Sequence, residues 1–249
     1  MTRVISARII GAFALFSAAA VGGAVFGVPE YLARQALEAA ESCHDLTERD
    51  RRCRFVGGPL EMAGAPVFME NFQQAFLPTR QQIDFVDAKG ETWTAPPRTL
   101  TDGASIPTIF APLVGDRQSR EYLIAAALHD AYCGVGNEGL DTYWARPWQE
   151  VHRMFYEALL VNGTPPQKAK LMFAAVYLGG PRWDDPERDL GDVSEAALLQ
   201  EMEWCLEWIR TENPSADEIE AWMDEREKAL KEGRPSVPDY IDAHDPRGL

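Results

Sequence analysis

Positive charge is scarce in this sequence. Its 249 residues include 24 Lys and Arg against 39 Asp and Glu, which gives a net charge of −15. A phosphate backbone repels such a chain unless basic residues gather locally. The densest basic run, residues 49–54, contains Asp50 and follows Asp45 and Glu48. Because no basic patch stands out, we expect no nucleic-acid partner.

Other common features are missing as well. The sequence has no internal repeat and no low-complexity tract. No Gly-x-Ser-x-Gly motif surrounds Ser105, which argues against a serine nucleophile of the elbow type. Hydrophobic residues make up 46%, and this apolar surface excludes disorder of the whole chain. The length fits one large domain, or one domain with an appendage.

Residues 1–29 predict a membrane-targeting segment. Arg3 and Arg8 precede a charge-free stretch, residues 9–29, that would span roughly 30 Å as a helix. We favour an uncleaved signal anchor; a cleaved signal peptide and a buried core helix are the alternatives. No Cys follows in a lipobox-like position, which argues against a lipoprotein. Both targeting interpretations place the bulk of the chain outside the cytoplasm, in the periplasm at a bacterial inner membrane or secreted.

Cysteine usage is compatible with export. The four cysteines are Cys43, Cys53, Cys133 and Cys205. Closing the ring between Cys43 and Cys53 would constrain the unfolded chain by about 3 kcal/mol in the entropy model. In an oxidising compartment we therefore expect these two to form a disulfide, with two free thiols as the alternative. For Cys133 we expect burial or a bond to Cys205.

The fold class predicted for the chain is α+β and predominantly helical, with a short β-hairpin region before a helical core. We divide the rest of the chain into a juxtamembrane segment (30–56), an α+β domain (57–190), an acidic helical extension (191–233) and an irregular tail (234–249).

Local patterns place the elements of the α+β domain. Residues 82–86 and 91–94 flank a Gly-containing turn and predict the hairpin. Apolar spacing, Pro and Gly signals predict helices over residues 119–133, 147–161 and 165–178.

Two amphipathic helices are expected in the acidic extension. Asp192 with Glu195, and Ser215 with Glu218, have the spacing of capping boxes. The first helix has an apolar face made of Leu198, Leu199, Met202, Cys205, Leu206 and Ile209. We expect this face to pack on its own domain; a partner-binding face is the alternative.

Two of the four histidines fall on consecutive predicted helices. His129 is followed by Asp130 at the end of an alanine-rich helix, and His152 lies beside the apolar stripe of the next helix. Asp102 comes from the tight loop before them. These four residues could bind one divalent metal ion and leave a position open for water. They could also act without metal, with a His as general base oriented by an Asp, or satisfy backbone groups at a helix end without any catalytic role.

Several motifs together resemble those of one protein family. They are TDGASIP (101–107), AALHD (126–130), FYEAL (155–159) with Gly163, and AAVY (174–177) before Gly179, Gly180 and Trp183. This is a domain-of-unknown-function family found in tailed phages, prophages and bacterial genomes. The resemblance covers residues 72–183. It implies a small α+β domain with a shared site at the Asp-Gly-Ala-Ser-Ile-Pro loop and the helical His-Asp motif.

The chain departs from the family pattern at two positions. The family has Tyr where this chain has Cys133, and Asp where this chain has His152. Both changes touch the predicted site, so they would alter metal preference or remove catalysis. A weaker similarity links His129 and Asp130 to secreted phospholipases A2, in which the His activates water and the neighbouring Asp binds calcium. No glycine-rich calcium loop is visible.

Two functional hypotheses fit these residues. The first, which we favour, is a membrane-anchored, periplasm-facing hydrolase-like domain that acts on an envelope component. In it His129 is base or ligand, Asp130 is a ligand or orienting group, and Asp102 and His152 complete the site. The second is a non-catalytic envelope or phage-derived binding or assembly protein that uses its acidic C-terminal helices. The partner would be an envelope protein, a lipid or a cell-wall component.

Overall fold

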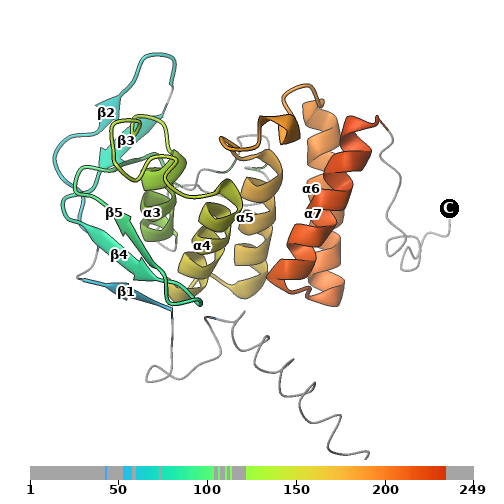
Figure 1. The fold of residues 1–249 in the computed structure, drawn as a ribbon, viewed down its shortest axis with the longest axis horizontal. Helices are drawn as coiled ribbons and strands as arrows, with labels where there is room; N and C mark the ends of the chain where they lie inside the picture. Colours follow the sequence, from blue (N-terminus) through green and yellow to red (C-terminus); the bar gives the residue numbers. More distant parts are fainter. Residues whose placement is uncertain are drawn as a thin grey trace, which may run out of the picture. The chain divides into compact units, whose positions relative to one another are not determined.

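The computed structural model describes residues 43, 53–57, 60–72, 74–103, 106, 110, 113 and 122–233. The predicted membrane segment, most of the juxtamembrane segment and the tail from residue 234 lie outside these residues. None of the described helices combines the length and apolar composition needed to cross a bilayer. The described chain is α+β, with five α-helices and two small antiparallel sheets (Figure 1). The predicted class is confirmed, although about half of this part is helical rather than most of it.

A β-hairpin forms where the alternating pattern predicts one. Strand β4 (Ile83–Val86) pairs antiparallel with β5 (Thr92–Ala95), and β1 (Arg54–Val56) pairs with the other edge of β4. Buried and less buried side chains alternate along β4 and β5, as expected for a sheet with one face on the core. The buried side chains are Ile83, Phe85, Trp93 and Ala95.

The second sheet is shorter and is tied to a helix end. Strand β3 (Ala75–Pro78) lies between β2 (Val67–Phe68) and β6 (Leu100–Thr101). The Asn137 side chain accepts a hydrogen bond from the Leu100 N–H and donates to the carbonyl oxygens of Leu100 and Asp130, each at 2.8 Å. Asn137 therefore fastens β6 to the backbone at Asp130.

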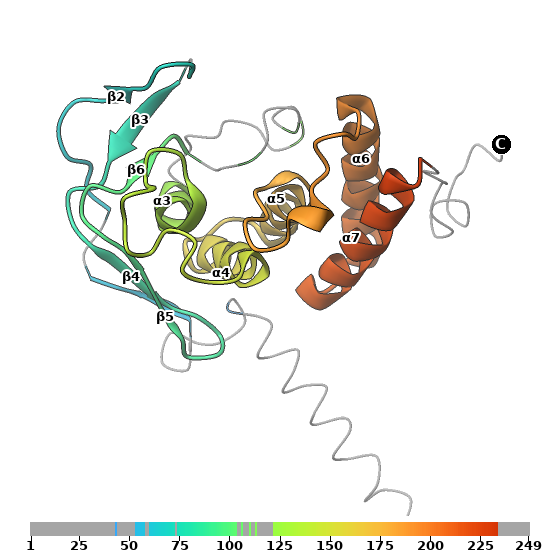
Figure 2. The same ribbon diagram turned by 45° about the horizontal axis from the view of Figure 1, so that its top comes forward.

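Three helices pack side by side next to the sheets. They are α3 (Leu123–Cys133), α4 (Trp148–Val161) and α5 (Pro166–Gly179), and they follow one another in space in that order (Figures 1 and 2). Helix α5 buries every residue from Ala169 to Leu178 because it has neighbours on both sides. The predicted bounds of α4 and α5 are correct to within one residue. For the first helix, the described part begins at Leu123, and residues 119–121 lie outside it.

Helices α6 (Glu195–Glu212) and α7 (Ala216–Lys231) cover the other side of α5. The Ser215–Glu218 capping box is confirmed, with bonds in both directions. The predicted box at Asp192 is wrong. Ser194 is the residue that caps α6, because its hydroxyl accepts the Ala197 N–H, and the chain is still in a turn at Asp192.

The apolar stripe of these two helices is buried against their own domain, as predicted. The buried residues that join the common core are Leu198, Met202, Cys205, Ile209, Ala216, Ile219, Met223 and Leu230, while Leu199 and Leu206 of the predicted face are partly buried against it. Ion pairs add to this packing. Arg182, which follows α5, contacts Glu227 of α7 at 2.9 Å, with both side chains buried. Arg153 of α4 contacts Asp217 at 2.7 Å and Glu220 at 2.9 Å.

The cysteine pairing agrees with the expectation in one respect and differs in another. Cys43 and Cys53 form the predicted disulfide. Cys133 and Cys205 are both buried and both free. The expected burial of Cys133 is therefore confirmed, and the alternative of a bond to Cys205 is wrong.

Candidate functional site

The two central histidines meet in the core. His129 lies on α3 and His152 on α4, and the packing of these helices brings their rings into contact. His129 Nε2 is 2.9 Å from His152 Nδ1, which is a hydrogen-bond distance. The ring centroids are 5.1 Å apart, and both side chains are fully buried. The run Ala125–Ala127 on α3 is buried as well, and such small side chains allow close helix packing.

Asp130 and Cys133 border the other side of the His129 ring. The Asp130 carboxylate Oδ1 is 3.7 Å from His129 Nδ1, close enough for an electrostatic contact but long for a hydrogen bond. The Cys133 Sγ is 3.6 Å from the same nitrogen. Burial, and to a lesser degree the charge of Asp130, raises the pKa of the Cys133 thiol well above its usual range. Cys133 is therefore a neutral neighbour of His129 and not a thiolate nucleophile.

His152 has aromatic neighbours and one buried ring nitrogen without a hydrogen-bond partner among the described residues. Its ring packs edge-on against Trp148 at 5.4 Å and Trp183 at 6.3 Å between centroids. Burial lowers the pKa of His152 well below its usual range, and the proximity of His129 and Arg182 lowers it further, while the backbone carbonyl of Pro181 acts in the opposite direction. The imidazole is therefore neutral at pH 7. Its Nε2 has no hydrogen-bond partner among the described residues, which is unusual for a buried polar atom.

The histidine pair shares one proton between its facing nitrogens. In one tautomer His152 Nδ1 donates to His129 Nε2, and the single ring proton of His129 is on Nδ1, beside Asp130. In the other tautomer His129 donates, and His152 Nε2 carries a proton that the backbone carbonyl of Pro181 attracts. The carboxylate of Asp130 favours the first tautomer because it attracts the Nδ1 proton of His129. His152 Nε2 is then a free base.

Asp102 takes a different place from the histidines. Its carboxylate accepts a hydrogen bond from Gln74 Nε2 at 2.8 Å. No contact within the described part of the chain joins it to His129 or His152. The loop that follows Asp102 includes Ser105, which is outside the described residues. The structure thus brings together three of the four predicted site residues.

The predicted metal ligands do not converge as a set in this structure. Among the described residues, the group of possible ligands whose atoms lie within 4.8 Å of one another is Cys43, Cys53 and Glu157. A metal ion at the histidine pair would need to replace the proton between the rings, and carboxylates would have to move closer. The binding of a divalent metal ion here stays a prediction.

Sequence reasoning missed the residues that surround His152 Nε2. Gly180 is one of them: a Cβ placed there would lie 3.1 Å from this nitrogen. In the sequence the Gly179-Gly180-Pro181 run predicts the end of a helix, which is correct, but it carries no sign of a contact with α4. Gly180 and Trp183 belong to the motifs that carry the family resemblance, but nothing in the sequence indicates that they lie beside His152. Trp148 carries no such sign either, because aromatic residues are common in any core.

The fold and the site define an α+β domain with a buried imidazole pair on two packed helices. Residues 79–176 match the model of a protein family of unknown function, DUF1353. An uncharacterised protein of Sinorhizobium fredii, y4iH, is 44% identical over 104 residues, which are 42% of this chain and 40% of that protein. A second one, y4jT from the same organism, is 32% identical over 126 residues, 51% of this chain and 35% of its own.

The match extends over only part of each protein, since the chain spans about two fifths or less of the length of these relatives. No solved structure matches the chain. The comparisons therefore agree with the resemblance to a family of unknown function. Both His129 and His152 lie within the residues that match the family model.

Proposed function

We propose that this protein is a hydrolase-type enzyme whose base is the His129–His152 pair. The observation that carries the proposal is the 2.9 Å contact between His129 Nε2 and His152 Nδ1, together with the open Nε2 of His152. A neutral imidazole with one nitrogen that has no hydrogen-bond partner among the described residues is a suitable general base, because a base must be unprotonated before it acts. Perturbed pKa values in such a cluster also favour a functional site over a purely structural one.

The proton would move along the pair. His152 Nε2 takes a proton from the attacking water or hydroxyl group, and His152 Nδ1 passes its own proton to His129 Nε2. The positive charge then lies on His129, beside the Asp130 carboxylate at 3.7 Å from Nδ1. Asp130 is thus a positioning residue that stabilises the imidazolium. A role for Asp102 in the reaction stays a prediction from the sequence, since its carboxylate accepts a hydrogen bond from Gln74.

The setting that we propose is the bacterial envelope. The charge-free stretch at residues 9–29 favours a membrane anchor with the domain on the periplasmic side, and the Cys43–Cys53 disulfide is compatible with an oxidising compartment. The substrate would then be a lipid or a cell-wall component. A divalent metal ion held by His129, Asp130, His152 and Asp102 is the alternative form of the same site.

A variant series tests the proposal. The full chain, purified in detergent, is assayed on panels of lipid and cell-wall substrates beside His129→Gln, His152→Gln and the control His244→Gln in the tail. We expect each core variant to lose activity by at least roughly 100-fold, the usual range for loss of a general base, while His244→Gln stays unchanged. Circular dichroism checks that the variants are folded.

Elemental mass spectrometry of the same samples separates the two forms of the site. Stoichiometric metal that disappears in both core variants would indicate metal-assisted chemistry. Activity without metal would support the imidazole pair alone. An activity that persists in folded His129→Gln and His152→Gln would contradict the proposal. So would inactivity of the wild-type protein on every panel, which would favour the non-catalytic binding protein.

A further inference from the structure

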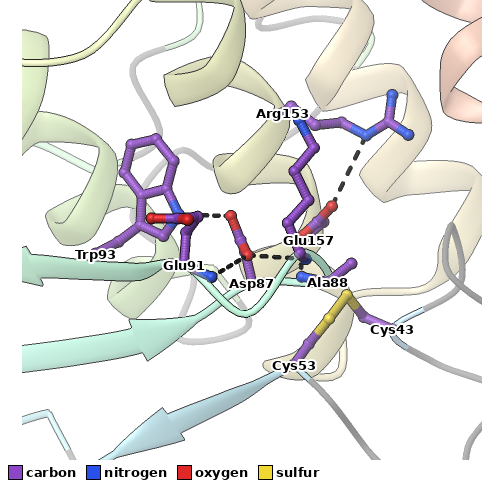
Figure 3. The surroundings of a disulfide bond; sticks show 9 residues. Cys43, Cys53, Asp87, Ala88, Glu91, Trp93, Arg153 and Glu157 are labelled. Carbon is purple, nitrogen blue, oxygen red and sulfur yellow. Dashed lines mark hydrogen bonds and ion pairs between the residues drawn. A yellow bond between two sulfur atoms is a disulfide. The ribbon is translucent and has the colours of Figure 1, made fainter.

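A second cluster of ligating side chains lies where α4 meets the hairpin turn and the disulfide. Cys43, Cys53 and Glu157 offer two sulfur atoms and a carboxylate oxygen within 4.8 Å of one another (Figure 3). All three residues are buried, with 3%, 2% and 5% exposure. The structure therefore places a carboxyl group directly against a disulfide, with little of either group exposed to solvent.

The Glu157 carboxyl group is held firmly in this position. Its Oε2 accepts the Ala88 N–H at 2.9 Å, and its Oε1 is 3.9 Å from Arg153 Nε (Figure 3). The hairpin turn that presents Ala88 is itself fixed by Asp87, whose carboxylate accepts the N–H groups of Lys89 and Glu91. A rigid, preorganised carboxylate is what a metal site requires of a ligand.

We propose that Cys43, Cys53 and Glu157 form a redox-gated zinc site, which is closed in the disulfide form and opens on reduction. The reductant is a dithiol. It gives two electrons and two protons to the disulfide, the bond between the two sulfur atoms breaks, and the dithiol leaves as its own disulfide. Zn²⁺ then displaces the two thiol protons, and any proton on Glu157, into solvent. Two thiolates and one carboxylate bind the metal, with a fourth position open to water.

The chemistry of the ligands favours zinc. Thiolate and carboxylate ligands at about 2.3 Å and about 2.1 Å are usual for Zn²⁺, with four ligands in tetrahedral arrangement. The Cα atoms of Cys43 and Cys53 are 5.5 Å apart, so rotation of the side chains suffices to separate the sulfur atoms around one ion. The three ligands would carry a charge of −3 and leave a net −1 with zinc. Arg153 and Lys89, which both act on Glu157, would offset it.

Zinc titration of the full chain tests this inference, independently of any hydrolase activity. The protein is prepared oxidised or reduced with a phosphine, then titrated with Zn²⁺ alone and, for a thiolate charge-transfer band, with Co²⁺. We expect one ion per reduced chain, no binding at this site when oxidised, and slower reoxidation with zinc present. Equal binding in both redox forms, or none in the reduced form, would overturn the proposal without any substitution being made.

Variants then assign the ligands. Glu157→Gln retains both cysteines and should weaken zinc binding at least roughly tenfold, since it removes one of three protein ligands. Cys53→Ser should abolish it. The matched control is Cys205→Ala, which removes a buried free thiol on α6 and should leave zinc binding unchanged. Unaltered affinity in Glu157→Gln, or loss in Cys205→Ala, would contradict the assignment.

Discussion

The open nitrogen of His152 depends on a single glycine. A Cβ at Gly180 would lie 3.1 Å from His152 Nε2 and 2.3 Å from the carbonyl oxygen of Val176. The Gly180 φ of −80° is accessible to any residue, so lack of space, and not backbone conformation, requires glycine here.

We expect Gly180→Ala to destabilise the protein by about 1–3 kcal/mol, the usual cost of overpacking a core. The same change should shift the NMR signals of the His152 ring, because the added methyl group presses on it. Urea unfolding and imidazole NMR measure the two effects. Gly139→Ala is the control, since a Cβ there meets nothing within 4 Å. Wild-type stability and unshifted His152 signals in Gly180→Ala would contradict this account of the site.

Glu157 makes stability depend on pH. Burial raises its pKa from 4.5 to about 7, with a further contribution from Asp87, while the Ala88 N–H, Arg153 and Lys89 act in the opposite direction. Between about pH 4.5 and about pH 7, the Glu157 side chain therefore stays protonated in the folded protein but loses its proton in the unfolded chain. The resulting stabilisation is fully present below about pH 4.5 and is lost as pH rises through about 7.

The Glu157→Gln variant should lack this dependence, because Gln resembles the protonated acid. We expect the free energy of unfolding of the oxidised wild type, relative to Glu157→Gln, to fall by up to about 3 kcal/mol between about pH 5 and about pH 8. Urea unfolding at a series of pH values measures it. Glu150→Gln, an exposed carboxylate on the same helix, is the control. If the free energy of unfolding changed with pH in the same way for wild type and Glu157→Gln, the folded protein would not retain the Glu157 proton.

At the scale of elements, α6 and α7 belong to the core and are not an added interaction arm. Their apolar residues cover α5, and the buried Arg182 would lose its partner Glu227 without them. A buried charge that loses its partner costs about 3–5 kcal/mol. The outer acidic face of the pair is the part that a binding partner could still use.

Truncation after Asp192 should therefore prevent stable folding. We expect the shortened chain to lose cooperative thermal unfolding, because the apolar face of α5 becomes exposed to water. Circular dichroism melts measure this, with a truncation after Gly233 as control, since that chain retains both helices. A cooperatively folded 1–192 chain would contradict the account and restore the two helices as a separable partner-binding module.

The predictions at element scale succeeded or failed for identifiable reasons. The Ser215–Glu218 box and the hairpin depend on residues a few positions apart, so the sequence pattern was enough. Asp192 with Glu195 has the same spacing as a capping box, but the Val193 N–H donates to the Leu190 carbonyl oxygen in a turn. That turn delays the helix to Ser194. Asp192 and Ser194 are both residue types that cap helices well. Because Asp192 lies inside the preceding turn, Ser194 is the one that caps α6.

At the scale of the whole molecule, the sequence by itself determined the α+β class, the Cys43–Cys53 pairing and the burial of the α6–α7 stripe. Each of these depends on composition, on periodicity or on neighbours in the chain. Only the tertiary structure decided that His129 and His152 meet, that Asp102 contacts Gln74, and that Glu157 faces the disulfide. The physical reason is that periodicity assigns a residue to a face of its helix, whereas the relative position and rotation of two helices arise from the packing of all their side chains.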